Sequence, residues 1–271
     1  MQFLDIPTAR RLEAAEEVPQ MEIARVLART QPEIGAEILA IAGGHAIFAG
    51  LNSPIGRATG LGFDGPVTAA QLDQVEAFYV RHHAPAQVDI TPLTDASLLE
   101  LVKGRGYTIY ELNNVMARRL SAGEHLEEHV QGIEFRDCTP DQTRLWGETM
   151  LRGFFPDGPP EGWLELVCPM AEVPHSLAMI AWDGDRPVAA VGGLISPEHR
   201  MVALGGTSTL PEYRGRRIQT AAIGRRLNRA MRQGCDLAVI VTQGNTTSQR
   251  NAERLGFTVA YSKATVGKNL S

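Results

Sequence analysis

Cysteine is scarce in this sequence of 271 residues: there are three, Cys138, Cys168 and Cys235, and no two of them form a Cys-x-x-Cys pair. An odd number of widely separated cysteines gives no sign of a zinc site or of a dithiol redox centre. This usage fits a reducing compartment, so we expect a cytoplasmic protein.

Long uninterrupted apolar runs are also missing. The first residues, MQFLDIPTARRLEAAEEV, lack the apolar core of a signal peptide, and the stretch 34–49 is interrupted by Glu37, Gly43, Gly44 and His45. We therefore expect a protein that is neither secreted through a signal peptide nor inserted in a membrane.

Positive charge is in deficit, with 26 Lys and Arg against 31 Asp and Glu and a formal net charge of -5. This balance argues against a broad basic surface, so we do not expect nucleic acid as a partner. Hydrophobic residues make up 44% and charged residues 21%, which excludes fibrous and wholly disordered chains. The length is sufficient for two ordinary domains.

The first half of the sequence predicts a mixture of helices and strands. Apolar residues at three- and four-residue spacing up to about Ala42 indicate two packing helices, separated at Gln31-Pro32. The elements predicted after them are strands at 45–51, 58–63, 87–93 and 107–120, a helix beginning near Thr68 and a helix at 95–103.

The second half repeats this order of elements. It predicts a strand at 133–136, a helix at 141–154 and strands at 176–182, 187–195 and 201–209. A helix at 217–233, a strand at 237–242, a helix at 247–255 and a strand at 257–266 follow. We interpret the chain as a tandem duplication of one α/β unit. The predicted boundaries are a domain at 1–120, a polar linker at 121–131 and a second domain at 132–271.

The most informative stretch is 207–223, TSTLPEYRGRRIQTAAI. A strand ends here, and a loop rich in Arg and Gly leads directly into a helix whose first amides have no acceptor within the helix. These amides, the positive end of the helix dipole and the side chains of Arg214, Arg216 and Arg217 surround one spot. Pyrophosphate is the ligand that this geometry suits.

Two other charged segments have simpler interpretations. Arg225, Arg226, Arg229 and Arg232 lie off the apolar stripe of the helix, so we interpret these four as its solvated face. The letters of 125–129, HLEEH, match a zinc motif, but this charged segment has no apolar frame and no third ligand. We therefore expect no metal.

The arginine loop resembles a family motif. The residues 214–219, RGRRIQ, are similar to the R/Q-x-x-G-x-G/A pyrophosphate loop of the GNAT (GCN5-related) acyl-CoA N-acyltransferases, and PEYRG is a common lead-in to that loop. Asn245 after a strand, followed by SQRNAERLGF at 248–257, resembles the next block of the family. The resemblance covers about 133–268. It implies a GNAT-like fold, repeated in tandem, in which a mixed and mostly antiparallel sheet is flanked by helices.

The resemblance also implies a function. It implies an N-acetyltransferase that transfers the acetyl group of acetyl-CoA to a primary amine of a small acceptor, by direct attack in a ternary complex. It places acetyl-CoA on Ser208, Thr209, Leu210, Arg214, Gly215, Arg216, Arg217, Ile218, Gln219, Thr220, Asn245 and Arg250. It gives Asp157, in the segment between the first two helices of that domain, a role on the acceptor side, for which packing is the alternative.

The sequence departs from the family pattern at three positions. Arg217 stands where the pattern has Gly, and Gln219 stands where it has Gly or Ala. Side chains at these two positions narrow the space through which the backbone approaches phosphate. Ala252 stands where many members carry a Tyr that protonates the departing thiolate. Tyr261, on the following strand, is the nearby substitute that we predict as the acid, and simple packing is its alternative role.

The base for the reaction and the role of the first half are less defined. The strand at 201–210 holds no acidic residue, which leaves Glu198, His199 or a water relay as the base. The lack of a clear base, together with Ala252, keeps open a second hypothesis, a non-catalytic acyl-CoA sensor.

The counterpart of the loop in the first half has Asp64 and Pro66 in place of arginines, so we expect a degenerate copy that shapes the acceptor cleft or a homodimer.

Overall fold

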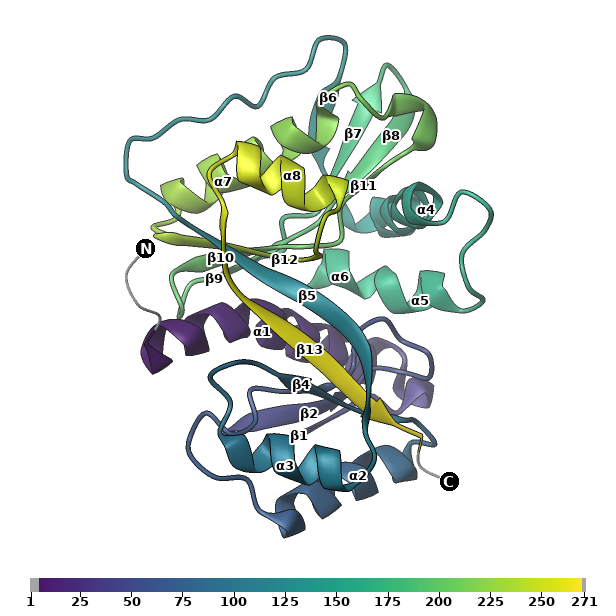
Figure 1. Ribbon diagram of the computed structural model, residues 1–271. Helices are drawn as coiled ribbons and strands as arrows, with labels where there is room; N and C mark the ends of the chain where they lie inside the picture. The colour runs from purple at the N-terminus through teal and green to yellow at the C-terminus, as the bar shows by residue number, and fades with distance from the viewer. Residues whose placement is uncertain (1–4, 270–271) are drawn as a thin grey trace. The chain divides into compact units, whose positions relative to one another are not determined.

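The computed structural model describes residues 5–269 (Figure 1). The described chain forms two compact units: unit 1 contains 5–115, 242–244 and 259–269, and unit 2 contains 116–241 and 245–258. Each unit combines helices with β-strands, which confirms the predicted α/β class.

Unit 1 is built around the strand order β1-β2-β3-β4-β13. Its elements are α1 (Ile6–Thr30), a short 3-10 turn (Pro32–Ile34), β1 (Glu37–Ile41), β2 (Gly44–Phe48), β3 (Ala58–Thr59), α2 (Ala69–Arg81), β4 (Ala86–Ile90), α3 (Ala96–Gly104), most of β5 (Thr108–Arg119) and most of β13 (Thr258–Lys268). The β3 and β4 strands are parallel, while β4 and β13 are antiparallel.

The prediction of two helices before Ala42 is wrong for the second of them. A single helix, α1, ends at Thr30, and the apolar residues that follow form the strand β1. Ala42 and Gly43 both have positive φ angles, 52° and 82°, and turn the chain directly into β2. A short apolar run fits a helix or a strand equally well, and here the hairpin pairing decided the outcome.

Unit 2 holds the remaining elements. They are β6 (Glu134–Asp137), a 3-10 turn (Pro140–Gln142), α4 (Thr143–Phe154), α5 (Trp163–Val167), α6 (Pro169–Glu172), β7 (Met179–Asp183), β8 (Arg186–Val191), β9 (Leu194–Ser196), β10 (Met201–Leu204), β11 (Ser208–Thr209), a 3-10 turn (Pro211–Tyr213), α7 (Ile218–Arg232), most of β12 (Leu237–Gln243) and α8 (Thr247–Arg254). Trp146 of α4 is fully buried, and its indole N–H donates to the carbonyl of Val191 at 3.0 Å, which anchors α4 on the sheet.

The strands of unit 2 separate into two sheets. β10 runs parallel to β12 as far as Leu204, whereas β11, farther along the same chain segment, pairs with β8 and stands at the end of the order β11-β8-β7-β6. The separation needs glycine at the close approach of the two segments, because a Cβ on Gly192 would lie 2.7 Å from the carbonyl oxygen of Gly205. Among residues 5–269, one edge of β11 is thereby left without a neighbouring strand, just before the arginine loop.

The two halves repeat one crossover and exchange their last strands. β3-α2-β4 and β10-α7-β12 are both parallel strand pairs joined through a helix. β13 follows α8 of unit 2 but pairs with β4 of unit 1, while the end of β5 groups with unit 2. The compact units therefore differ from the predicted boundaries 1–120 and 132–271 in their last strands.

The segment 121–131, which we predicted as a linker, lies along α7. Asn228 exchanges two hydrogen bonds with the backbone of Leu126, each of 3.0 Å. A Cβ on Gly224 would overlap the carbonyl oxygen of Glu127, so this glycine allows the segment to pack directly on the helix. The segment is irregular in structure but attached to unit 2.

Candidate functional site

A cavity of about 520 Å³ lies within unit 2, where α4, β11, the arginine loop and α8 meet. Its lining residues are Gly153, Phe154, Thr207, Ser208, Thr209, Tyr213, Arg214, Gly215, Arg217, Ile218, Gln219, Thr220, Thr247, Ser248, Asn251 and Arg254. Figure 1 shows α8, in yellow, alongside α7, whose N-terminus follows the loop. Three arginines and the N-termini of α7 and α8 thus border a single space.

The wall formed by α4 and β11 is tightly packed. The Ser208 hydroxyl donates to the carbonyl of Met150 at 2.7 Å, and a Cβ on Gly153 would overlap the Ser208 side chain. Arg214 extends this wall, because its Nη2 donates to the Gly153 carbonyl at 2.7 Å and its Nε to the Thr209 carbonyl at 3.4 Å. The Arg214 side chain therefore fixes the loop to the end of α4.

Aromatic stacking holds the next arginine. The Arg216 guanidinium lies 4.6 Å from the centre of the Tyr213 ring, and the Tyr213 hydroxyl donates to Asp183 at 3.0 Å. A cation above an aromatic ring is attracted to the negative face of the ring. Tyr213 lines the cavity, whereas Arg216, which we predicted to bind CoA, is not among its lining residues.

The N-terminus of α7 has no side-chain cap among the described residues, and Arg217 occupies the cap position with a φ of 62°. The equivalent helix of unit 1 is closed differently. In α2 the Thr68 hydroxyl accepts from the Gln71 amide at 3.2 Å, and the Gln71 side chain accepts from the Thr68 amide at 2.9 Å. The capping box satisfies two amides at the start of α2, those of Thr68 and Gln71, while no side chain between residues 5 and 269 caps α7, whose first amides can bind an anion.

The helix α8 forms the other side of the cavity. Asn251 is 8% exposed, and its side-chain amide donates to Gln219 at 2.9 Å. Gln219, which departs from the family pattern, therefore ties α7 to α8. Sequence reasoning missed Thr247, Ser248, Asn251 and Arg254, although their three- and four-residue spacing marks one polar face of a helix.

Eight of the residues predicted to bind acetyl-CoA line this cavity: Ser208, Thr209, Arg214, Gly215, Arg217, Ile218, Gln219 and Thr220. Leu210 is instead 1% exposed and packs in the core. Asn245 and Arg250 lie at the start of α8, where the Arg250 guanidinium donates to the Asn245 side chain at 3.3 Å.

The predicted acceptor and base residues are not among the residues that line the cavity. Asp157 is exposed in the loop after α4. Glu198 and His199 lie in the turn between β9 and β10, where the His199 ring is 2.8 Å from the Ser196 hydroxyl. The strand β10 and the residues 205–207 separate this turn from Ser208, about 23 Å of chain at ~3.3 Å per residue.

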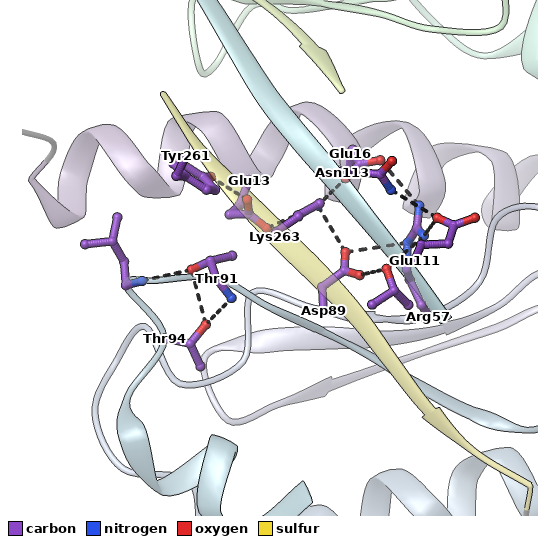
Figure 2. Close-up of polar contacts among 12 residues, drawn as sticks. Glu13, Glu16, Arg57, Asp89, Thr91, Thr94, Glu111, Asn113, Tyr261 and Lys263 are labelled. Carbon is purple, nitrogen blue, oxygen red and sulfur yellow. Dashed lines mark hydrogen bonds and ion pairs between the residues drawn. The ribbon is translucent and has the colours of Figure 1, made fainter. Parts of the chain in front are cut away.

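Tyr261 belongs to a buried polar network in unit 1 (Figure 2). Its hydroxyl donates to Glu13, and burial together with this carboxylate raises the pKa of Tyr261, so the phenol keeps its proton. Lys263, two residues along β13, is 2% exposed and lies 3.5 Å from Glu13 and 3.1 Å from Asp89. Ala252, which the sequence resemblance places at the position of an acid, is fully buried.

The prediction that Arg226 faces solvent is wrong. Its side chain is 2% exposed, and burial lowers its pKa to about 9. The guanidinium is held by neutral oxygen atoms: the carbonyl of Ala222 at 3.0 Å, the carbonyl of Gly192 and the hydroxyl of Thr207 at 2.9 Å. Of the other three arginines of this face, Arg225 and Arg229 are partly buried, and Arg229 pairs with Asp137 at 2.8 Å. Arg232 is exposed, as predicted.

The geometry agrees with the family comparison. The model of the acetyltransferase (GNAT) family matches residues 144–257, which include the arginine loop and most of the cavity lining. Residues 144–257 are a GNAT acetyltransferase domain. No curated protein matches the chain at a significant level.

Solved GNAT proteins share the fold at low sequence identity. A GCN5-related N-acetyltransferase from Kribbella flavida is 15% identical with a TM-score of 0.64, over 92% of this chain and 96% of that one. A tandem GNAT protein from the clavulanic acid biosynthesis pathway is 12% identical with a TM-score of 0.63, over 91% and 87%. A GCN5-related N-acetyltransferase from Sphaerobacter thermophilus is 22% identical with a TM-score of 0.52, over 69% of this chain and 60% of that one. The similarity to the tandem protein extends beyond the GNAT domain itself.

Metal-ligating clusters and membrane-spanning helices are two further features of a chain that can indicate function. Between residues 5 and 269 there is no group of three or more His, Cys, Asp or Glu side chains arranged to hold a metal ion. None of the helices in that range is both long and apolar enough to cross a membrane.

Proposed function

We propose that this protein is an N-acetyltransferase that transfers the acetyl group of acetyl-CoA to a primary amine of a small-molecule acceptor. The observation that carries the proposal is the uncapped N-terminus of α7 at a cavity lined by Arg214, Arg217 and Arg254. Helix amides and guanidinium groups together suit the two phosphates of a pyrophosphate. The GNAT match over residues 144–257 supports an acyl-CoA as the ligand.

The edge of β11 supports binding of the pantetheine arm. β11 stands at the end of its sheet, and Ser208 and Thr209 also line the cavity. Backbone groups at a sheet edge pair with an extended ligand as they would with another strand. On this proposal Ser208 to Leu210 bind the arm, and residues 214–220 bind the pyrophosphate.

The chemistry is a direct acyl transfer within a ternary complex. The neutral amine nitrogen attacks the thioester carbon, and the C–N bond forms as the C–S bond breaks. The nitrogen loses a proton to give the amide, and CoA leaves as a thiolate that takes up a proton. An alkylammonium of pKa about 10.4 is only about one part in a thousand neutral near pH 7.4, so the attacking amine must first lose a proton. We propose a water relay for this step, because Glu198 and His199 lie at the far end of β10.

Two residue roles stay predictions. Tyr261 is the predicted acid for the thiolate, and Asp157 is the predicted contact to the acceptor. We also propose that the protein acts in the cytoplasm, with its cysteines reduced. We further propose that its first half binds no CoA, since Asp64 and Pro66 replace the arginines there and the capping box of α2 already engages two amides.

A non-catalytic acyl-CoA sensor is the second candidate. Two observations favour it: the fully buried Ala252 stands at the usual position of the acid, and the Tyr261 hydroxyl is engaged by Glu13. A sensor needs the anion site of α7 but neither an acid nor a base.

One experiment separates the two candidates. Binding of acetyl-CoA is measured by calorimetry, and release of free CoA thiol is then measured with amino acids, polyamines and amine drugs. Thiol release that increases with added amine supports the enzyme, whereas tight binding without turnover over the whole panel supports the sensor. Absence of binding at millimolar acetyl-CoA contradicts both.

A further inference from the structure

Arg226 is a buried cation without a carboxylate partner among residues 5–269. Its guanidinium is 2% exposed and is held by the three neutral oxygens of Ala222, Gly192 and Thr207. Burying a charge is costly unless an opposite charge compensates it, so a neutral side chain would fill this space at a lower cost. The presence of an arginine here calls for a role beyond packing.

The partners of Arg226 mark the point where the two sheets of unit 2 separate. Gly192 directly follows β8, and Thr207 directly precedes β11. The Thr207 hydroxyl accepts from Arg226 at 2.9 Å and from the Gly192 amide at 3.1 Å. One guanidinium therefore holds both segments where they part, and Thr207 itself lines the cavity.

The helix that carries Arg226 also forms the anion site. Arg226 lies eight positions after Ile218, the first residue of α7, which is about 12 Å along a helix at ~1.5 Å per residue. A single rigid helix thus sets the spacing between the pyrophosphate site at its N-terminus and the strand edge that Arg226 holds. The reacting thioester of a bound acyl-CoA must lie beyond the pantetheine arm, along that edge.

We propose that Arg226 is a positioning residue for acetyl transfer: it fixes Thr207 and the backbone that leads into β11, and its uncompensated charge makes this part of the cavity wall positive. The proposal rests on the proposed function. Negative charge develops on the thioester oxygen during attack, and a preorganised positive wall stabilises that oxygen without having to reorient. Arg226 acts through Thr207 and the strand, not by touching the substrate.

The first arm of the test needs no ligand. Hydrogen exchange of backbone amides is measured in the wild type, in Arg226→Met and in the control Arg225→Met. Arg225 is the adjacent arginine, whose guanidinium lies 5.2 Å from the centre of the Phe135 ring. We expect amides of 205–208 to exchange at least ten-fold faster in Arg226→Met than in the control. Equal exchange in the two variants overturns the positioning role.

The second arm is kinetic and uses acetyl-CoA with an accepted amine. Arg226→Met is expected to lower kcat at least ten-fold while the Kd of acetyl-CoA changes less than three-fold, and Arg226→Lys is expected to recover part of the loss. Arg225→Met is expected to keep the wild-type kcat. An unchanged kcat in folded Arg226→Met overturns the catalytic part of the proposal.

Thr207→Val covers the case in which Arg226→Met does not fold. This variant keeps the shape of the side chain and removes the hydroxyl that Arg226 contacts, so the same loss of kcat is expected, and an unchanged kcat overturns the proposal. If the wild type neither binds acetyl-CoA nor acetylates an amine, the proposed function fails. Hydrogen exchange of the amides of 205–208, measured also in Thr207→Val, then still decides whether Arg226 holds the strand.

Discussion

The guanidinium of Arg214 donates a 2.7 Å hydrogen bond to the carbonyl oxygen of Gly153, and this contact joins the arginine loop to the end of α4. Arg214 is thus held by backbone acceptors on one side while it borders the cavity on the other. A fixed guanidinium loses little conformational entropy when an anion binds.

Arginine substitutions in the loop should weaken binding of CoA. Arg214→Ala and Arg216→Ala are each expected to reduce the thermal stabilisation that CoA gives to the protein, because each removes a positive charge beside the helix N-terminus. Asp64→Ala, in the counterpart loop of unit 1, is the control and should leave the stabilisation unchanged. An equal loss in Asp64→Ala would mean that the anion site lies in the other half.

Gly153→Ala should disturb the wall of the cavity. The new Cβ would overlap the Ser208 side chain, so we expect a loss of about 1–3 kcal/mol in the free energy of unfolding and weaker CoA binding. Gly104→Ala in α3 is the control, since no atom lies within 4 Å of its added Cβ. Urea unfolding measures both, and a Gly153→Ala protein as stable as the wild type contradicts the close packing of Gly153 on Ser208.

The left-handed conformation of Arg217 separates two substitutions that remove the same charge. Its φ of 62° is easily adopted by glycine and is unfavourable for alanine. Arg217→Gly is therefore expected to be more stable than Arg217→Ala by about 1 kcal/mol in urea unfolding, with equally weakened CoA binding. Equal stabilities would show that the loop relaxes to another conformation.

Tyr261→Phe tests the predicted acid. If the phenol protonates the CoA thiolate, kcat should fall ten-fold or more, which is about 1.4 kcal/mol, with the affinity for acetyl-CoA unchanged. If the only role of the hydroxyl is its hydrogen bond to Glu13, kcat stays the same and only the free energy of unfolding falls. The two readouts, steady-state kinetics and urea unfolding, are made on the same protein sample.

The pH dependence of stability should follow the buried network of unit 1. Burial opposes ionisation of Asp89, but Lys263 and Arg57 hold its pKa below the ordinary value of 3.8. The unfolded chain therefore binds more protons than the folded one, and the stability that Asp89 contributes is present above about pH 4 and lost as pH falls through the folded pKa. Burial raises the pKa of Glu13, which acts in the opposite direction.

Lys263→Met removes the cation that these carboxylates share. We expect a loss of about 3–5 kcal/mol at pH 7, since uncompensated charges remain buried, and a smaller loss at pH 5, where the carboxylates without their partner take up protons. Lys268→Met on the same strand is the control: its side chain is 35% exposed and 3.8 Å from Glu76, so its loss should stay below about 1 kcal/mol. A loss that does not depend on pH would contradict the role of the carboxylates.

Local sequence patterns predicted the anion site and most of the elements after Thr68, but not the short helices α5 and α6. Helix starts and stops, Arg/Gly loops and strand alternation each involve residues that are neighbours in the chain, so the loop before α7 can be predicted from the amino-acid sequence alone. Such patterns do not distinguish a short strand from a helix, which is why the sequence predicts a helix where β1 forms.

The environment of single side chains was decided by the three-dimensional packing. Arg226 lies off the apolar stripe of its helix, and its burial depends on the separation of two sheets that the sequence does not show. Tyr261 meets Glu13, which is 248 positions away, because β13 pairs with β4 in the opposite half of the chain. Burial and ion pairing depend on which distant segments pack together, and a periodic pattern records only that a face is covered, not what covers it.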